Sequence, residues 1–337
     1  MKKHSKRLLT AAALVMTTTA TIHIINKVIA ASACLKEMLD TDVRNYYHWR
    51  FGDIYYTKKG KGSPILLIHD MFPGGSGYEW GKIEDDLALE HTVYNLDLPG
   101  CGRSEKSGIT YTNFVYVQAI CDFIKNVIGE KTDVIVNGYA VSFVVMACHN
   151  EKDLFNKIMM VNPVSLSSLK QMPGKKEKLL RRCLEIPVFG TLVYHMVVSR
   201  DAVNNEFIEN YAFDPFHPDR DLQDAYYEAA HRGGCYAKNV YANKASKYMN
   251  IDITRGLKEI DNSLYIVEGE AENNGEAIIE AYQNVNPSVE AVMIKETKHF
   301  PHVEAPEQFL EQVGNLLLTE RTVRLEKKDK RKNSCLC

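Results

Sequence analysis

The chain has 337 residues, of which 45% are hydrophobic and 25% are charged, and its formal net charge is −2. This length and hydrophobic content are sufficient for one large domain with an insertion, and the near-neutral charge argues against nucleic acid as the main partner. The eight cysteines show no spacing typical of a zinc site or a disulfide framework, so we expect no bound metal.

Residues 1–35 predict a basic start followed by a membrane-anchoring helix. The segment "MKKHSKR" is basic, and the eighteen residues "LLTAAALVMTTTATIHII" that follow it carry no acidic or basic side chain apart from His23. About 18 to 20 apolar residues are enough to span a bilayer, so we expect the protein to partner a membrane through this helix.

Two alternatives to an anchor remain for this segment, and the side of the membrane stays open. The motif "ASAC" at 31–34 resembles a lipoprotein cleavage site, although Lys27 argues against processing there. The threonines and His23 also fit an amphipathic helix packed on the domain. The basic start favours a cytoplasmic N-terminus, which would place the body outside the cell, in tension with its free cysteines.

From residue 46 onward, strand patterns alternate with helix patterns. Strands are predicted at 47–51, 53–60, 63–70, 91–98, 133–138, 157–163, 263–269 and 291–297, and helices at 80–90, 110–130, 142–148, 276–285 and 306–318. Strands that alternate with helices indicate a mostly parallel sheet covered on both faces. We therefore predict an α/β core formed by 46–163 and 263–320.

Residues 164–262 lose this alternation and are rich in tyrosine, histidine and charge. We predict that they form a helical cap above the sheet, in which Tyr194, Tyr226, Tyr227 and Tyr236 serve as packing residues. The tail at 321–337 is basic, and we predict that it is disordered.

Four motifs together resemble the α/β-hydrolase superfamily. They are "LLIHD" followed by "PGGSGYEW", "DLPGCGRS" at 97–104, "VNGYAVSF" at 136–143 and "KHFPHVEAPEQF" at 298–309. Their order and spacing are similar to those of single-domain hydrolases with a cap, such as epoxide hydrolases, haloperoxidase-like esterases and meta-cleavage hydrolases. The resemblance implies an eight-stranded α/β-hydrolase fold, no cofactor, and a small hydrophobic or ester-like molecule bound in a capped pocket.

The same resemblance implies roles in an acyl-transfer site for several residues. His299 occupies the place of the catalytic base. Glu272 occupies the place of the acid that orients the base, with Glu270 as the alternative. The backbone N–H groups of Met71 and Val141 are the expected oxyanion donors.

Two departures from the family pattern affect the expected chemistry. Ala140 stands where the nucleophilic serine belongs, and Asp70 puts a carboxylate where glycine is usual. Ser142 is the fallback nucleophile, although it lies about 200° around the helix from Ala140.

These departures leave three hypotheses for the function. One is a degenerate hydrolase or small-molecule binding protein. Another is an enzyme in which His299 and Glu272 act as a general base without a serine. The third is an esterase that uses Ser142.

Overall fold

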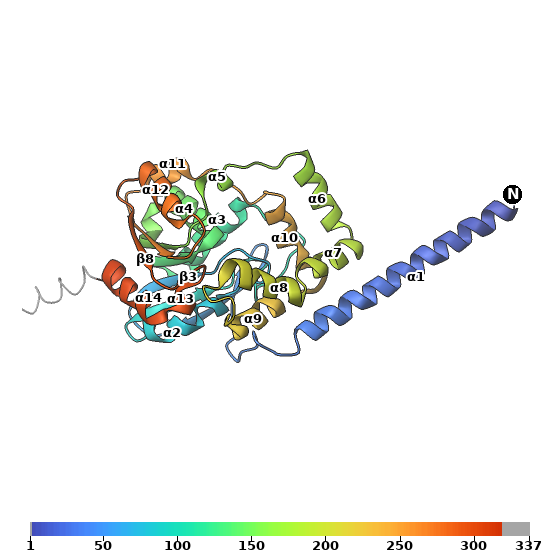
Figure 1. The fold of residues 1–337 in the computed structure, drawn as a ribbon, viewed down its shortest axis with the longest axis horizontal. Helices are drawn as coiled ribbons and strands as arrows, with labels where there is room; N and C mark the ends of the chain where they lie inside the picture. Colours follow the sequence, from blue (N-terminus) through green and yellow to red (C-terminus); the bar gives the residue numbers. More distant parts are fainter. Residues whose placement is uncertain (1, 319–337) are drawn as a thin grey trace, which may run out of the picture.

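An eight-stranded β-sheet forms the centre of the protein in the computed structural model, which describes residues 2–318 (Figure 1). The strands are β1 (Asn45–Trp49), β2 (Gly52–Lys59), β3 (Ser63–Ile68), β4 (His91–Leu96), β5 (Thr132–Asn137), β6 (Phe155–Val161), β7 (Ser263–Gly269) and β8 (Glu290–Ile294). Their order is β1-β2-β4-β3-β5-β6-β7-β8; β2 pairs antiparallel with both β1 and β4, and all other pairs are parallel. This confirms the predicted α/β-hydrolase sheet; the tail predicted at 321–337 lies outside the described residues.

The central strands are apolar on both sides because helices cover both faces of the sheet. In β3, Leu66 and Ile68 belong to one hydrophobic cluster, whereas Ile65 and Leu67 belong to the other. The first cluster includes side chains of α3 (Asn113–Phe123), α4 (Val141–Asn150) and α12 (Gly275–Val285). The second includes side chains of α2 (Gly81–Leu87) and α14 (Pro306–Val313).

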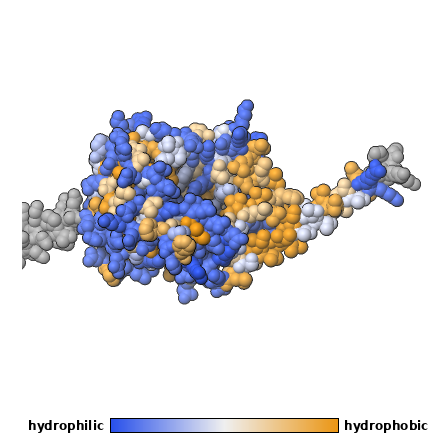
Figure 2. All heavy atoms as spheres, in the orientation of Figure 1, coloured by the Kyte–Doolittle hydropathy of each residue, from blue (hydrophilic) through white to orange (hydrophobic). Residues whose placement is uncertain are grey.

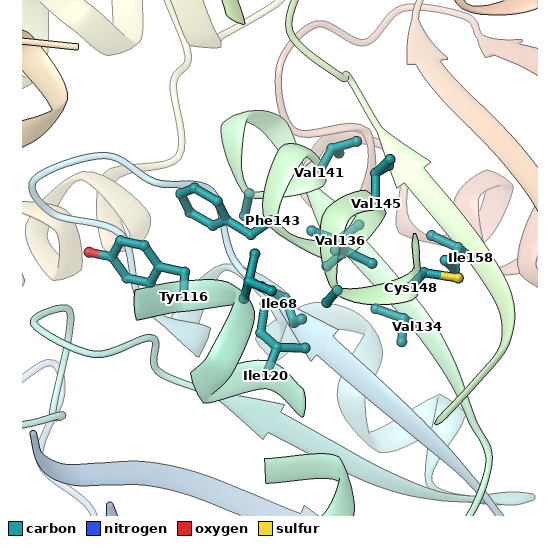
Figure 3. Close-up of a cluster of buried hydrophobic side chains, with 14 of the residues drawn as sticks. Ile68, Tyr116, Ile120, Val134, Val136, Val141, Phe143, Val145, Cys148 and Ile158 are labelled. Atoms are coloured by element: carbon teal, nitrogen blue, oxygen red, sulfur yellow. The ribbon is translucent and has the colours of Figure 1, made fainter. Parts of the chain in front are cut away.

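Helix α4 is held firmly against this first face of the sheet. Figure 3 shows Phe143 and Val145 of α4 beside Val136 of β5, with Ile120 of α3 below them. All four side chains are fully buried. The turn at the start of α4 is therefore fixed relative to the end of β5.

Short segments complete the core. They are η1 (Gly77–Trp80), η2 (Ile124–Ile128), η3 (Gly138–Ala140), η4 (Lys152–Leu154), α13 (Pro301–Glu304) and η7 (Gly314–Leu318). The helix predicted at 110–130 begins at Asn113 and ends at Gly129, whose φ of 78° lies in the left-handed region that glycine accommodates.

Helices fill the chain between β6 and β7, and we call residues 162–262 the insertion. They are α5 (Leu166–Leu169), α6 (Lys175–Glu185), α7 (Phe189–Val197), α8 (Arg200–Glu206), η5 (Phe207–Tyr211), α9 (Arg220–His231), η6 (Gly234–Tyr236), α10 (Lys238–Ala245) and α11 (Thr254–Glu259). Tyr194 and Tyr226 pack in the interior, but Tyr236 is 49% exposed, so its predicted packing role is wrong.

The N-terminal helix α1 (Lys2–Ala33) projects away from the body (Figure 1). Its span Lys6–Ala33 is long and apolar enough to cross a membrane, and the most apolar part of that span is not buried against the protein. Only the C-terminal part of α1 packs on the insertion, where Asn26 Nδ2 donates to the carbonyl of Val188 at 2.9 Å. The apolar stretch is therefore not packed on the domain.

Candidate active site

Asp70 lies just after β3, at the edge of the sheet where parallel strands end. Its Oδ1 accepts hydrogen bonds from the backbone N–H groups of Met71 at 2.6 Å and Tyr139 at 2.7 Å. Gly138 makes this approach possible, since its φ is 59° and a Cβ there would lie 2.2 Å from Asp70 Oδ1. The glycine of "VNGYAVSF" is thus required both by the turn and by the neighbouring carboxylate.

His299 lies between two carboxylates, in the loop that joins β8 to α13. Its Nε2 is 3.2 Å from Asp70 Oδ2, which is a hydrogen bond. Its Nδ1 is 3.6 Å from Glu272 Oε2, an ion-pair separation slightly too long for a hydrogen bond. The structure therefore brings His299, Glu272 and Asp70 together, and each ring nitrogen faces one carboxylate.

Asn162 fixes the loop that carries His299. Its Nδ2 donates to the carbonyls of Lys298 at 2.8 Å and His299 at 2.7 Å, while its Oδ1 accepts from the Gly269 N–H at 2.8 Å. From the insertion, Tyr211 accepts a hydrogen bond from the His299 N–H through its carbonyl, and its ring stacks on the imidazole at 4.6 Å. The insertion is thus part of the site.

The positive charge of His299 and the negative charges of the two carboxylates each favour the ionised form of the other group. Burial disfavours the imidazolium, but the hydrogen bond with Asp70 and the neighbouring Glu272 outweigh burial and raise the pKa of His299 to about 10. Burial likewise opposes ionisation of Asp70, but His299 and the positive charge of Lys244 hold the pKa of this carboxyl well below its usual value. At neutral pH the site therefore holds an imidazolium paired with an ionised Asp70.

The elbow itself offers no nucleophile. Ala140 is fully buried, and the Ser142 hydroxyl, also fully buried, donates to the Tyr139 carbonyl at 2.9 Å. The N–H of Val141, the other expected oxyanion donor, points to the carbonyls of Gly138 and Tyr139, because η3 leads directly into α4. The Met71 N–H is placed as expected, but Asp70 occupies it, and the second donor is Tyr139.

The alternative acid Glu270 lies elsewhere. Its side chain is exposed, and Oε2 accepts from the backbone N–H of Glu296 at 3.4 Å. Glu272 is the member of this loop that reaches His299.

The turn "DLPGCGRS" supports the oxyanion loop from below. The Asp97 carboxylate accepts from the N–H groups of Gly77 and Arg103, both at 2.7 Å, and pairs with the Arg103 guanidinium. The Ser104 hydroxyl donates to the Asp97 carbonyl at 2.6 Å and accepts from the Tyr55 N–H. This turn fixes η1 and, through η1, the surroundings of Asp70.

Glu79 is a fully buried carboxyl group behind Asp70. It accepts from the Asp70 N–H at 3.2 Å, from Asn137 Nδ2 at 3.1 Å and from the Tyr226 hydroxyl at 2.9 Å. Burial and the negative charge of Asp70 raise the pKa of Glu79 to about 8. Glu79 therefore links Asp70 and Asn137, at the ends of two strands, to Tyr226 of the insertion. Its carboxyl group is mainly protonated at pH 7.

Replacing Glu79 tests this network. Glu79→Ala leaves the buried groups of Asn137 and Tyr226 without an acceptor, so we expect a loss of about 3 kcal/mol in the free energy of unfolding, measured by urea denaturation. Glu79→Gln is the matched control and retains most of the stability at pH 7.

The sign of the pH dependence follows from the raised pKa. The unfolded carboxyl titrates near pH 4.3 and the folded one near pH 8, so the Glu79 contribution declines between these values. Glu79→Gln removes that decline. An equal decline in wild type and Glu79→Gln would contradict the assigned protonation.

Comparison with known proteins supports the fold and the motifs. A sequence model of the alpha/beta hydrolase family matches residues 65–312. The chain belongs to the alpha/beta hydrolase family.

Two curated relatives of this hydrolase-family chain match over only part of their length. A 2-hydroxy-6-oxo-6-(2'-aminophenyl)hexa-2,4-dienoic acid hydrolase of Metapseudomonas resinovorans is 31% identical over 118 residues, which cover 33% of this chain and 39% of the relative. A soluble epoxide hydrolase of Corynebacterium sp. (strain C12) is 25% identical over 111 residues, which cover 33% and 38%. The chain thus matches about two fifths of the length of each.

The fold also resembles solved structures of the family. A membrane phospholipase A, described as a bacterial virulence factor, has a TM-score of 0.64 at 18% identity, covering 94% of this chain and 99% of that one. At this identity the likeness shows the shared fold alone.

Sequence reasoning about this chain missed three residues around the candidate site. Glu79 directly precedes the tryptophan of the oxyanion motif. Nothing in the pattern of apolar residues there shows that this acid is buried. Tyr211 and Lys244 come from the insertion, where no family motif fixes the alignment. Lys244 Nζ lies 5.3 Å from the ring centre of Tyr139, on the insertion side of the site.

Proposed function

We propose that this protein is a serine-independent hydrolase in which Asp70 is the nucleophile and His299 the acid and base, with small epoxides as substrates. One observation carries the proposal. Two backbone N–H groups hold Asp70 Oδ1, while Oδ2 lies against His299 Nε2. A carboxylate held in this way has one oxygen fixed and the other directed toward the catalytic base, as covalent catalysis by a carboxylate requires.

The first step opens the ring. Asp70 Oδ2 attacks an epoxide carbon and the carbon–oxygen bond breaks, so that an ester forms on Asp70. The imidazolium of His299 gives its proton to the released alkoxide. Both charges of the ion pair are consumed, and His299 becomes neutral.

The second step restores the site. Without the negative charge of Asp70 beside it, neutral His299 is a competent base, and Glu272 on Nδ1 favours the return of positive charge. His299 takes a proton from water, and the hydroxide attacks the ester carbonyl. The carbon–oxygen bond to the substrate then breaks, the hydroxyl proton passes to the departing alkoxide, and the diol leaves. The Met71 and Tyr139 N–H groups stabilise the oxyanion on Oδ1. Asp70 is ionised again and His299 protonated.

Single turnover in heavy-oxygen water tests this cycle. With enzyme in excess over an aryl epoxide, the first diol released carries an ordinary oxygen from Asp70, and the peptide that contains Asp70 gains one heavy oxygen. Direct attack of water on the epoxide would instead put the heavy oxygen in the diol and leave the peptide unchanged. That result would overturn the assigned nucleophile.

A binding protein without catalysis is the second candidate. The feature that favours it is the mutual neutralisation of Asp70 and His299, whose side chains are only 6% and 12% exposed. In that case no diol forms and no heavy oxygen enters the Asp70 peptide, whereas small apolar ligands raise the melting temperature of the wild-type protein. The general-base hypothesis for the resting enzyme is less favoured, because a protonated His299 cannot accept a proton.

We further propose that α1 anchors the protein in a membrane. The support is the apolar span Lys6–Ala33, whose most apolar window is unburied. We expect full-length protein to stay in the membrane pellet after alkaline carbonate washing and a chain without residues 1–21 to be soluble. A soluble full-length chain would refute the anchor, and so would release of the body by cleavage near residues 31–34.

A further inference from the structure

Helices α6 and α7 carry an apolar surface that no part of the described chain covers. Its members are Leu179, Leu180, Ile186, Phe189, Val193, Met196 and Val197, each at least 40% exposed. Figure 2 shows hydrophobic residues gathered on this side of the body and continuing onto α1. Contiguous apolar surface of this kind marks an interaction site rather than ordinary exposed side chains.

The position of this surface relative to α1 indicates what covers it. The side chains of residues 8–25 are nearly all free of the body, and at about 1.5 Å per residue this part of α1 is about 27 Å long. The hydrocarbon core of a bilayer is about 30 Å thick. This free part only just matches that thickness and ends at Asn26, so a bilayer that it crosses has its surface at the level where α1 meets the body.

That level is the start of α7. Asn26 of α1 bonds to the carbonyl of Val188, and Phe189 begins α7. A cavity of about 750 Å³ at the same junction is lined by Ala30, Pro187 and Val188 among others. A bilayer that accommodates α1 therefore reaches both the cavity and the apolar surface.

The charge of α6 fits an anionic lipid surface. Lys175, Lys176, Lys178 and Arg182 are exposed. The acidic residues of the helix are Glu177 and Glu185, which form ion pairs with Lys247 and Arg181 respectively. Amphipathic helices with a basic side and an apolar side bind at the headgroup boundary.

We propose that α6 and α7 lie on the bilayer, with their apolar side chains at the boundary of headgroups and acyl chains and the basic residues of α6 on anionic headgroups. This inference rests on the proposed anchoring by α1 and goes beyond it, since an anchor alone requires no contact by the insertion.

Cys183 provides a native reporter for the test. It is exposed on α6, four residues after Leu179 and three after Leu180, so it lies on the same side of the helix. The full-length chain would carry a polarity-sensitive fluorophore on Cys183 alone, with Cys34, Cys235, Cys335 and Cys337 replaced by serine. Two matched chains, with Cys183 also replaced, carry the label at Leu14→Cys in α1 or Glu276→Cys in α12.

The labelled chains are reconstituted in vesicles of phosphatidylcholine and phosphatidylglycerol that contain a quencher on the acyl chain. We expect quenching of the labels at positions 183 and 14 to be several-fold stronger than at position 276. Adding Leu179→Asp and Phe189→Asp should abolish quenching at 183 and leave quenching at 14. Phe216→Asp, at a phenylalanine that is 85% exposed outside this surface, should change neither.

Each other outcome has a defined meaning. Quenching at 14 with none at 183 would overturn the docking surface and leave the anchor intact. No quenching at either position would overturn both. A label at 183 shielded from aqueous iodide but not quenched by lipid would indicate a second protein copy in place of the bilayer. Quenching at 183 that persists unchanged in pure phosphatidylcholine would overturn the role of the basic residues.

Discussion

Asp70→Asn is expected to lower kcat for epoxide hydrolysis by roughly 10⁴-fold or more, a scale set by the removal of nucleophiles in other hydrolases. The amide oxygen can still accept from the Met71 and Tyr139 N–H groups, so the fold and ligand binding should persist. What is lost is the nucleophilic carboxylate and the negative charge beside His299. The measurement is single-turnover diol formation by wild type and variant at equal concentration.

A second readout separates this role from a structural one. Without the Asp70 charge, the pKa of His299 should fall from about 10 toward its ordinary value, which NMR titration of the imidazole detects. Asp85→Asn, at an exposed carboxylate, is the matched control for both measurements. Full activity in Asp70→Asn, despite the shifted histidine, would rule out covalent catalysis by Asp70.

The double variant Asp70→Gly/Gly138→Ser is expected to gain esterase activity by roughly 10² to 10⁴ over the parent, because a Cβ at residue 138 points to the place of the Asp70 carboxylate beside His299. It restores glycine in the oxyanion loop and serine at the elbow, and it frees the Met71 and Tyr139 N–H groups for an oxyanion. With Asp70 gone, His299 is no longer held as an imidazolium and can act as the base. The measurement is burst release of a chromogenic acid from a short acyl ester.

Two controls give this result its meaning. Gly138→Ser alone should show little activity, because its side chain would meet the Asp70 carboxylate, which still occupies the donors and pairs with His299. His299→Ala added to the double variant should abolish the burst. A burst as large in Gly138→Ser as in the double variant would show that Asp70 does not block ester hydrolysis.

The parts of the fold that follow local rules could be predicted from the sequence. The apolar run of β3 and the periodic stripe of α3 each signal their own structure, and their alternation predicts the parallel sheet. His299 and Glu272 could be placed because their loops follow strands in a fixed family order. The sequence marks Asp70 only as a departure from that order.

The contacts of Asp70 could not be predicted, because they depend on how two loops meet in space. The distance from Asp70 to His299 joins residues that are 229 positions apart. The Val141 N–H points away from the expected oxyanion position because of η3, a 3₁₀ turn that a sequence pattern does not distinguish from the start of an α-helix. Tyr211 and Glu79 meet the site only through tertiary packing, which has no counterpart in periodicity.

The alanine at the elbow and the bonded hydroxyl of Ser142 also affect how this protein is found in cells. Fluorophosphonate reagents, which survey serine hydrolases across whole proteomes, need a serine oxygen that is free to attack, and this elbow presents none. We expect a sample rich in the protein to show no labelled band for it in such a survey. On the proposed mechanism, a reagent that carries an epoxide would alkylate Asp70 only until water hydrolyses the ester, so its detection requires stopping the reaction within one turnover.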